Sequence, residues 1–184
     1  MKSELLYSLL WEYRERWRVP VSSGSAESEG FAYVEGTVEG KLRGRFRGVN
    51  HSRQRSDGRF LTNVQGVILA QDKMTVTFDY QGVGCPYPAT LDPHEDRTKV
   101  TLAARHQSDH EDWCHLNDAV CVGVGENRFT DDGVRLLLLD VHEVIWEPFE
   151  DGRPTTRPEL PATVDVSPGY FDLAAIRKSR HPGE

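Results

Sequence analysis

Between Phe31 and Trp146, apolar residues recur at every second position in short runs, and this alternation restricts the fold more than any other feature. A strand directs successive side chains to opposite faces of a sheet, so a period of two predicts half-buried β-strands rather than helices. Gly, Asp, Asn and Pro residues bound the runs and favour tight turns. The pattern predicts strands over 31–38, 41–49, 59–69, 74–82, 98–105, 119–125 and 134–146.

Residues 5–17 fit two interpretations. Their apolar residues mark one face of a helix, but they also alternate as in a strand, with Glu15 as the only interruption. The aromatic residues among them favour a strand, which makes eight. Eight mostly antiparallel strands joined by short hairpins can close into an up-and-down, calycin-like β-barrel that has no exposed edges. The interior of such a barrel holds side chains or one small ligand.

The composition changes after Trp146. Residues 147–167 contain four prolines, which cannot donate to a strand ladder and are typical of an extended segment. Ser167 and Pro168 can start a short helix that ends in a basic turn. We therefore expect a barrel domain over 1–146 and a proline-rich extension over 147–184 with a short helix.

Charge and cysteine content restrict the location and the partners. The 184 residues carry a formal net charge of −7, which disfavours a nucleic-acid partner. No apolar run is long enough for a membrane span or a signal peptide. The three cysteines, an odd number without CxxC spacing, suit reduced thiols in a reducing compartment. We expect a cytoplasmic protein with no membrane partner.

Several segments resemble a known family in their order along the chain. They are EGTVEGKLRGRFRGVN (35–50), RSDGRFLTNVQGVILAQDKMTVTFDYQGVG (55–84), HLNDAVCVGVGE (115–126) and VHEV (141–144). Together they resemble the bacterial and fungal DUF3237 family, a domain of unknown function, over roughly residues 5–146. The resemblance implies an eight-stranded antiparallel barrel and a homo-oligomer, but no settled activity, because a fold does not imply a function.

Three residues depart from the family pattern. His115 and His142 stand where the family often has Trp and Tyr, and Asp79 stands where it tends to have Arg. An imidazole near a carboxylate can act as a general acid or base near neutral pH. His142 is therefore the leading catalytic candidate, with Asp79 or Asp140 as the carboxylate that orients it.

Polar residues that share a strand face with these candidates are predicted to bind the substrate. One interpretation directs this face into the barrel, and the other makes it the wet outer face around an apolar interior. One or two arginines of the basic run at 41–59 are predicted to hold a ligand carboxylate or phosphate at the barrel mouth; otherwise the run pairs with acidic strands or a partner subunit. The predicted binding residues are Asn63, Gln65, Asn117, His115, Arg43 and Arg45.

Two further motifs carry weaker signals. His106, His110 and Cys114 have the spacing of ligands on one helix, but Ser108 and Glu111 form a capping box that starts a short helix at Asp109 and leaves His106 outside it. We therefore predict no metal site, and a metal-assisted hydrolase using His106, His110 and His115 is the least favoured alternative. Gly123 and Gly125 indicate a bend of the barrel or a large side chain crossing its interior, not a nucleotide loop.

Taken together, the sequence predicts a barrel that binds one small organic molecule, aromatic or polyketide-like. If it is an enzyme, we expect cofactor-free proton transfer, as in an isomerase, cyclase or lyase. The alternative is a non-catalytic ligand-binding or structural protein that assembles as a homo-oligomer.

Overall fold

The computed structural model describes residues 2–71, 73–86, 97–130 and 133–147. These residues form eight strands and one short 3₁₀ helix, η2. The elements are β1 (Lys2–Pro20), β2 (Ser28–Gly40), β3 (Gly44–Gln54), β4 (Phe60–Ala70), β5 (Thr75–Pro86), β6 (Thr98–Gln107), η2 (Cys114–Asn117), β7 (Cys121–Phe129) and β8 (Arg135–Ile145).

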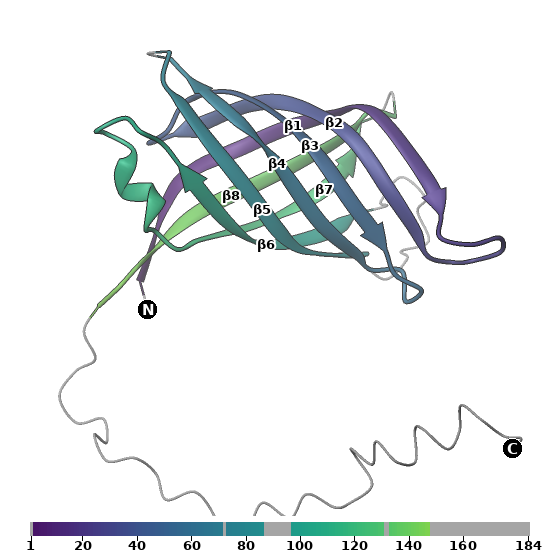
Figure 1. Cartoon of the computed structure of the whole chain (residues 1–184). Coiled ribbons are helices and arrows are strands. Elements are labelled where there is room, and N and C mark those ends of the chain that lie inside the picture. Colours follow the sequence, from purple (N-terminus) through teal and green to yellow (C-terminus); the bar gives the residue numbers. More distant parts are fainter. Residues whose placement is uncertain (1, 72, 87–96, 131–132, 148–184) are drawn as a thin grey trace, which may run out of the picture. The chain divides into compact units, whose positions relative to one another are not determined.

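The strands close into a barrel in sequence order, each antiparallel to the next, and β8 pairs with β1 (Figure 1). The predicted eight-stranded up-and-down barrel is confirmed, and residues 5–17 belong to a strand. A helix is predicted to begin at Asp109, but this segment forms a turn followed by η2. In the turn, the Ser108 hydroxyl accepts a hydrogen bond from the His110 N–H at 3.3 Å. The predicted 147–184 extension and its helix lie, apart from Glu147, outside the described residues. Within the described part of the chain, no helix has the length and hydrophobicity needed to cross a membrane.

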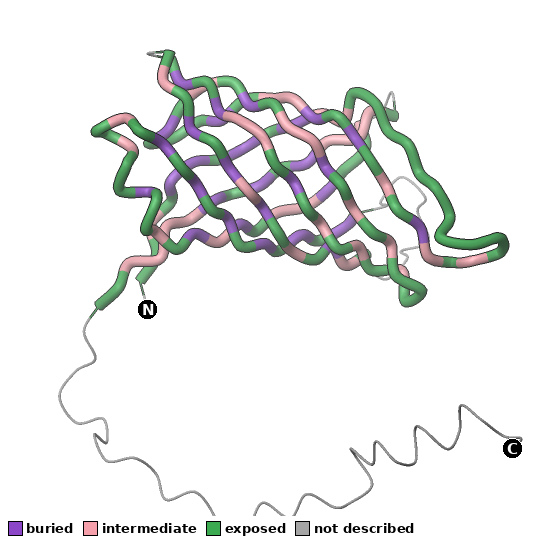
Figure 2. The backbone as a smooth tube through the Cα atoms, viewed as in Figure 1, coloured by how far each residue is buried: buried purple, intermediate pink, exposed green. Residues whose placement is uncertain are grey.

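Buried and exposed residues alternate along the strands (Figure 2). On β4 and β5 the buried positions are apolar, for example Val64, Ile68, Val76 and Phe78. The polar face therefore lies outside, and the interpretation that directed it into a shared hollow is wrong. The residues concerned are Asn63, Gln65, Asp79, Asp140 and His142. Period two shows which residues share a face, but burial of apolar area decides which face is inside.

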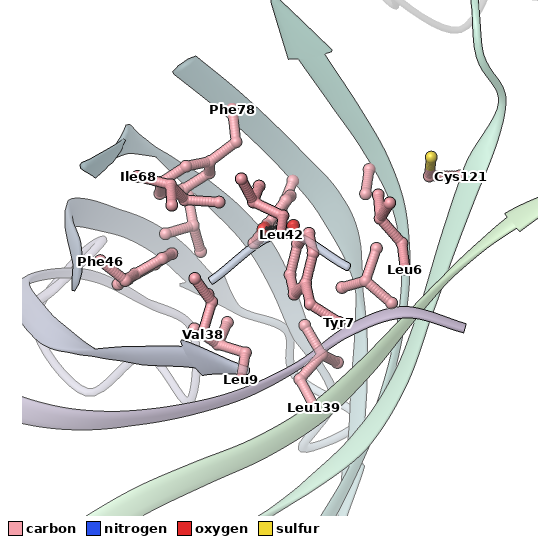
Figure 3. Packing of buried hydrophobic residues seen from close by; sticks show 14 of the residues in the cluster. Leu6, Tyr7, Leu9, Val38, Leu42, Phe46, Ile68, Phe78, Cys121 and Leu139 are labelled. Carbon is pink, nitrogen blue, oxygen red and sulfur yellow. Dashed lines mark hydrogen bonds between the residues drawn. The ribbon is translucent and has the colours of Figure 1, made fainter. Parts of the chain in front are cut away.

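Buried hydrophobic side chains pack together inside the barrel (Figure 3), and a stack of aromatic rings lies among them. Phe46 stacks on Trp11 and on Phe78 with centroid distances of 5.1 and 4.5 Å, and Phe78 lies 4.5 Å from Tyr80. Gly66 makes room for this stack, because a Cβ there would lie 2.7 Å from Phe78 Cζ. The interior at this level is a packed core with no space for a ligand.

A hydrogen-bonded chain of Tyr80, Tyr7 and His106 crosses the core beside the stack. The Tyr7 hydroxyl bonds the Tyr80 hydroxyl and lies 2.6 Å from His106 Nε2. All three side chains are almost fully buried. Burial lowers the pKa of His106 to about 4, and it raises the pKa of Tyr7 and of Tyr80. At neutral pH the chain is therefore uncharged, which suits a structural role.

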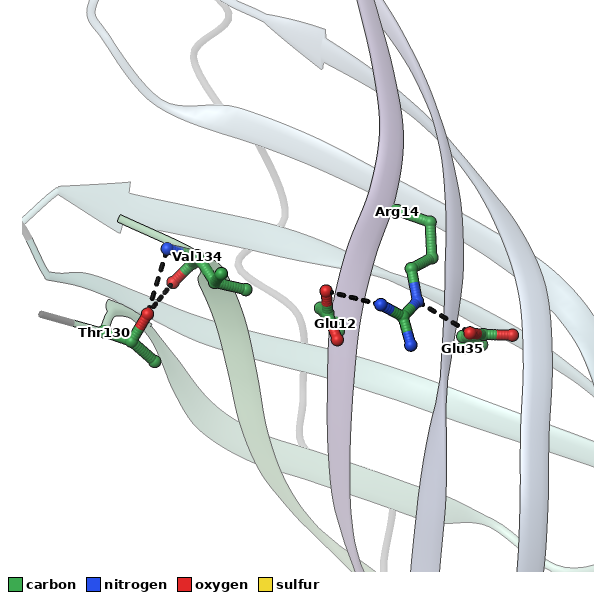
Figure 4. Close-up of polar contacts among 5 residues, drawn as sticks. All are labelled: Glu12, Arg14, Glu35, Thr130 and Val134. Atoms are coloured by element: carbon green, nitrogen blue, oxygen red, sulfur yellow. Dashed lines mark hydrogen bonds and ion pairs between the residues drawn. The ribbon is translucent and has the colours of Figure 1, made fainter. Parts of the chain in front are cut away.

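A β-bulge at Arg14 changes the facing of the second half of β1. Tyr13 and Glu15 pair with the consecutive residues Val34 and Tyr33, so Arg14 is the extra residue. Arg14 extends outward to the carboxylates of Glu12 and Glu35, at 2.8 and 2.6 Å (Figure 4). Beyond the bulge the alternation is inverted, so Arg16 and Arg18 share the inner side with Tyr13.

The two glycines of β7 have different neighbours, which leads to a prediction. A Cβ on Gly125 would lie 2.0 Å from the Leu138 backbone oxygen, whereas one on Gly123 would meet the flexible Leu102 side chain at 2.6 Å. We expect Gly125→Ala to lower the free energy of unfolding by about 3 kcal/mol, the upper end of overpacking costs, and Gly123→Ala by about 1 kcal/mol. Urea denaturation of both variants measures the difference. Equal losses would contradict this account of the barrel's close approaches.

The buried His106 predicts a pH-dependent stability. Its imidazole is neutral in the folded barrel, but in the unfolded chain it takes up a proton below its ordinary pKa of 6.5. The contribution is therefore complete above pH 6.5 and is lost as the pH falls toward 4, by about 3 kcal/mol in total. We expect His106→Gln to show a flatter decline than wild type in urea denaturation over this range. Parallel curves for the two proteins would show that His106 does not titrate as described.

Candidate functional site

One end of the barrel opens into a pocket of about 630 Å³. The ends of all eight strands contribute to it, at the end of the barrel that carries the hairpins joining β1 to β2, β3 to β4 and β7 to β8. We call it the mouth pocket. Its described lining comprises Tyr13, Arg16, Trp17, Arg18, Gly30, Phe31, Ala32, Asn50, Ser52, Gln54, Gly58, Phe60, Thr62, Gly84, Pro86, Thr98, Val100, Asn127, Phe129 and Arg135.

Small residues on β2 separate a cationic wall from a polar wall. Arg16 pairs with Ala32, and Ala32 pairs with Asn50, so these three residues form one row across β1, β2 and β3. The next row holds Arg18, Gly30 and Ser52 in the same way. Neighbouring strands lie about 4.8 Å apart, so the arginines on β1 and the polar residues on β3 are about 10 Å apart at the backbone. Ala32 and Gly30 contribute little or no side chain between the two walls, and a Cβ on Gly30 would lie 2.9 Å from the Ser52 hydroxyl.

Arg16 and Arg18, together with Arg135, give the mouth pocket its positive charge. Among the described residues, no carboxylate lies within ion-pair distance of the Arg16 or the Arg18 guanidinium. Most arginines of the outer wall differ in this respect, as Arg14 and Arg53 do with Glu35 and Glu27. Two inward guanidiniums without a carboxylate partner suit an oxyanion, which guanidinium binds through paired N–H donors.

Aromatic rings hold guanidiniums at the rim. The Arg18 guanidinium lies 5.5 Å from the Phe60 ring centre, and Arg135 lies 5.1 Å from Tyr13 and 5.9 Å from Phe129. Such cation–π contacts reduce the freedom of a long side chain and cost it none of its N–H donors. Burial raises the pKa of Tyr13, and the nearby positive charge of Arg135 only partly opposes this. Tyr13 is therefore a neutral phenol at physiological pH.

Two buried asparagines lie deeper in the mouth pocket. Asn50 and Asn127 are only 6% and 5% exposed, and the side-chain oxygen of each is buried without a hydrogen-bond partner. Leaving a buried acceptor unpaired costs about 1–3 kcal/mol. Groups of this kind are uncommon in folded proteins and point to a missing partner, such as a ligand or a water.

The mouth pocket lacks the usual acid–base groups. Among its described lining residues there is no His, Asp, Glu or Cys. The arrangement can therefore bind and orient an anion, and Tyr13 is the titratable side chain of the described lining besides the arginines.

Most of the predicted site residues lie on the outer wall, in separate groups. Asp79 accepts hydrogen bonds from Gln65 at 3.3 Å and from Gln81 at 3.2 Å. Asp140 accepts one from the Ser8 hydroxyl at 2.6 Å. Asp79 is on β5, whereas Asp140 and His142 are on β8, and β6 and β7 lie between these strands. The proposed pairing of His142 with Asp79 therefore does not form, and Asn63 stands exposed on β4.

A second pocket, of about 660 Å³, does bring three predicted residues together. Gln65, Asp79 and Asn117 line it with Arg105, mainly along the outer side of β4, β5 and β6. Two of these residues already have partners: Asp79 accepts hydrogen bonds from the two glutamines, and Asn117 binds both backbone groups of Ser108, at 2.8 and 3.0 Å. Asn117 thus fixes the segment between β6 and β7, and the exposed His115 stands beside Trp113 on this segment.

The basic run of β3 is on the outer wall and is largely neutralised there. Arg43 pairs with Glu39 at 2.8 Å, and Lys41 pairs with Glu4 at 2.9 Å. Arg45 is also exposed, opposite Thr37 and Leu69. Neither Arg43 nor Arg45 lines the mouth pocket. These contacts support one of the alternatives for this run, namely that it pairs with acidic residues of the same molecule.

The histidines of the metal hypothesis also separate. His106 points into the core, whereas His110 and His115 lie outside, with His110 beside Asp112 at 3.6 Å. Within the described ranges, no three His, Cys, Asp or Glu side chains are gathered as metal ligands.

The sequence reasoning missed the residues that line the mouth pocket. One signal was available, because Glu15 breaks the alternation of residues 5–17 and a break in phase is typical of a bulge. If the inward–outward alternation of side chains is shifted by one residue after Tyr13, Arg16 and Arg18 point inward. For Asn50 the signal was its place in the inner series of Phe46 and Gly48.

Comparisons with known proteins identify the fold and the family. A family model described as "Protein of unknown function (DUF3237)" matches residues 3–144. A search of curated proteins finds no match.

Three solved structures resemble the chain. A β-barrel-like protein from Acinetobacter baumannii AYE has 18% identity and a TM-score of 0.64, covering 77% of this chain and 94% of that one. A protein of unknown function from Clostridium acetobutylicum has 12% identity and a TM-score of 0.66, covering 79% and 100%. A conserved protein of unknown function from Rhodopseudomonas palustris has 12% identity and a TM-score of 0.63, covering 78% and 97%.

At such low identity the solved structures establish the fold alone. The family model extends over nearly the whole barrel, from Ser3 in β1 to Val144 in β8. The chain therefore belongs to the DUF3237 family of proteins of unknown function.

Proposed function

We propose that the protein binds one small organic anion, a carboxylate or a phosphate, in the mouth pocket. The observation that carries the proposal is the pair of inward guanidiniums, Arg16 and Arg18, which have no carboxylate partner among the described residues. The pocket volume of about 630 Å³ supports it, since small-molecule sites commonly measure about 300–1,000 Å³.

The proposal is for binding, because the described lining offers no His, Asp, Glu or Cys to transfer a proton at neutral pH. The acid–base roles predicted for His142, Asp79 and Asp140 stay predictions, and these residues stand outside the mouth pocket. The homo-oligomer implied by the family resemblance likewise stays a prediction.

Charge removal tests the proposal. Benzoate and phenyl phosphate serve as anionic probes, and benzamide serves as the neutral counterpart of benzoate. We expect the anions to bind more tightly than benzamide, and Arg16→Gln with Arg18→Gln to weaken anion binding at least tenfold. A hydrogen bond to a charged group contributes about 1.5–3 kcal/mol, and about 1.4 kcal/mol corresponds to a factor of ten. Isothermal titration calorimetry measures the affinities.

The matched control is Arg47→Gln, which removes one positive charge from the outer wall near Glu35 and is compared with Arg16→Gln and Arg18→Gln as single variants. It is expected to leave anion affinity within about twofold of wild type. Equal weakening by Arg47→Gln would assign the effect to overall charge, and tight benzamide binding would remove the role of the anion.

A steric change tests the location. Ala32 lies between Arg16 and Asn50 and is 6% exposed. In Ala32→Leu the larger side chain projects into the mouth pocket between the arginines of β1 and the polar residues of β3. We therefore expect binding of benzoate and of phenyl phosphate to be lost. Ala103→Leu, on the outer side of β6, is the control and should bind as wild type does. If calorimetry shows full binding by Ala32→Leu with an intact fold by circular dichroism, the ligand lies elsewhere.

A further inference from the structure

We propose that the ligand of the mouth pocket is a hydroxylated acid, whose anionic group meets Arg16 and Arg18 while its hydroxyl groups donate hydrogen bonds to Asn50 and Asn127. This inference rests on the proposed function and adds the chemical class and the orientation of the ligand.

The two asparagines supply the evidence for donors on the ligand. Each is more than nine-tenths buried, each lines the mouth pocket, and each has a buried side-chain oxygen without a partner. A carboxamide oxygen is an acceptor, so the group that completes it must carry an O–H or N–H. A carboxylate or phosphate dianion placed there would set oxygen against oxygen and find no proton to share.

The arrangement of the walls fixes the orientation. The guanidiniums are on β1, Asn50 is two strands away on β3, and Asn127 is on β7, on the other side of β1 from Asn50. The anion therefore faces β1, and the donors point to its two sides, toward β3 and β7. A backbone separation of about 10 Å between β1 and β3, shortened by the side chains, suits groups at opposite ends of one six-membered ring.

The remaining lining suits a flat apolar body between these ends. Phe60 and Phe129 stand at the rim, and Val100 and Ala32 offer apolar surface deeper inside. The Trp11–Phe46 stack, with centroids 5.1 Å apart, closes the interior below. A long or branched ligand is excluded from the core because the packed rings leave it no room.

Three probe acids test this inference by calorimetry: 3,4-dihydroxybenzoate, 3,4-dimethoxybenzoate and benzoate. The dimethoxy compound keeps the oxygens but has no donors. We expect the dihydroxy acid to bind at least tenfold more tightly than the other two. Two hydrogen bonds of about 1 kcal/mol each correspond to roughly thirtyfold.

Asn50→Leu with Asn127→Leu removes the acceptors and keeps a similar side-chain size. In this variant the preference for the dihydroxy acid is expected to fall to twofold or less, while benzoate still binds. Gln81→Leu, which removes a carboxamide from the outer wall, is the control and should keep the full preference. The single variants Asn50→Leu and Asn127→Leu serve if the double variant does not fold, and each should lose part of the preference.

The outcomes separate this inference from the proposed function. If wild type binds all three acids equally, or if the preference survives in the asparagine variants, the hydroxylated class is wrong, although a dependence on Arg16 and Arg18 would still support anion binding. If wild type binds none of the acids and no phenyl phosphate, both proposals fall. The three affinities of the wild-type protein test the inference by themselves, even if the asparagine variants do not fold.

Discussion

The bulge at Arg14 is the constraint on which the mouth pocket depends. One extra residue in β1 shifts the alternation, so that Trp17 turns outward toward Phe31 and Tyr33, and Arg16 and Arg18 turn inward. Without it, unbroken alternation would turn Glu15, Trp17 and Val19 inward and leave Arg16 and Arg18 on the outer face. The bulge is held on the outside, because the Arg14 guanidinium bonds carboxylates of both β1 and β2.

The barrel is thereby divided into a sealed part and an open part. The sealed part contains the aromatic stack and the Tyr80–Tyr7–His106 chain, whose groups are uncharged and nearly all paired with one another. Dense packing there fixes the strand register and the diameter of the barrel. The open part inherits that fixed geometry, and the contacts of Arg18 with Phe60 and of Arg135 with Tyr13 further restrict its side chains, which is the preorganisation that a binding site needs.

The sequence predicted the frame well and the site poorly, for a physical reason. Alternation depends on local backbone geometry, so the strands and the closed antiparallel barrel could be inferred from it. Which face points inward depends on the summed burial over all strands, and the polar series Asn63, Gln65 and Asp79 was wrongly considered as an inner one. A bulge reverses that facing within one strand, and only the interruption at Glu15 indicated it.

The composition of the mouth pocket is itself an argument for a ligand. A barrel selected for stability alone would place apolar side chains where Asn50 and Asn127 stand, because unpaired buried acceptors oppose folding. Stability and binding therefore make opposite demands on these positions. A bound anion with hydroxyl donors would satisfy these asparagines and the guanidiniums of Arg16 and Arg18 at once and stabilise the folded state in proportion to its occupancy. The ligand we propose therefore supplies what these groups lack: negative charge at β1 and hydrogen-bond donors at β3 and β7.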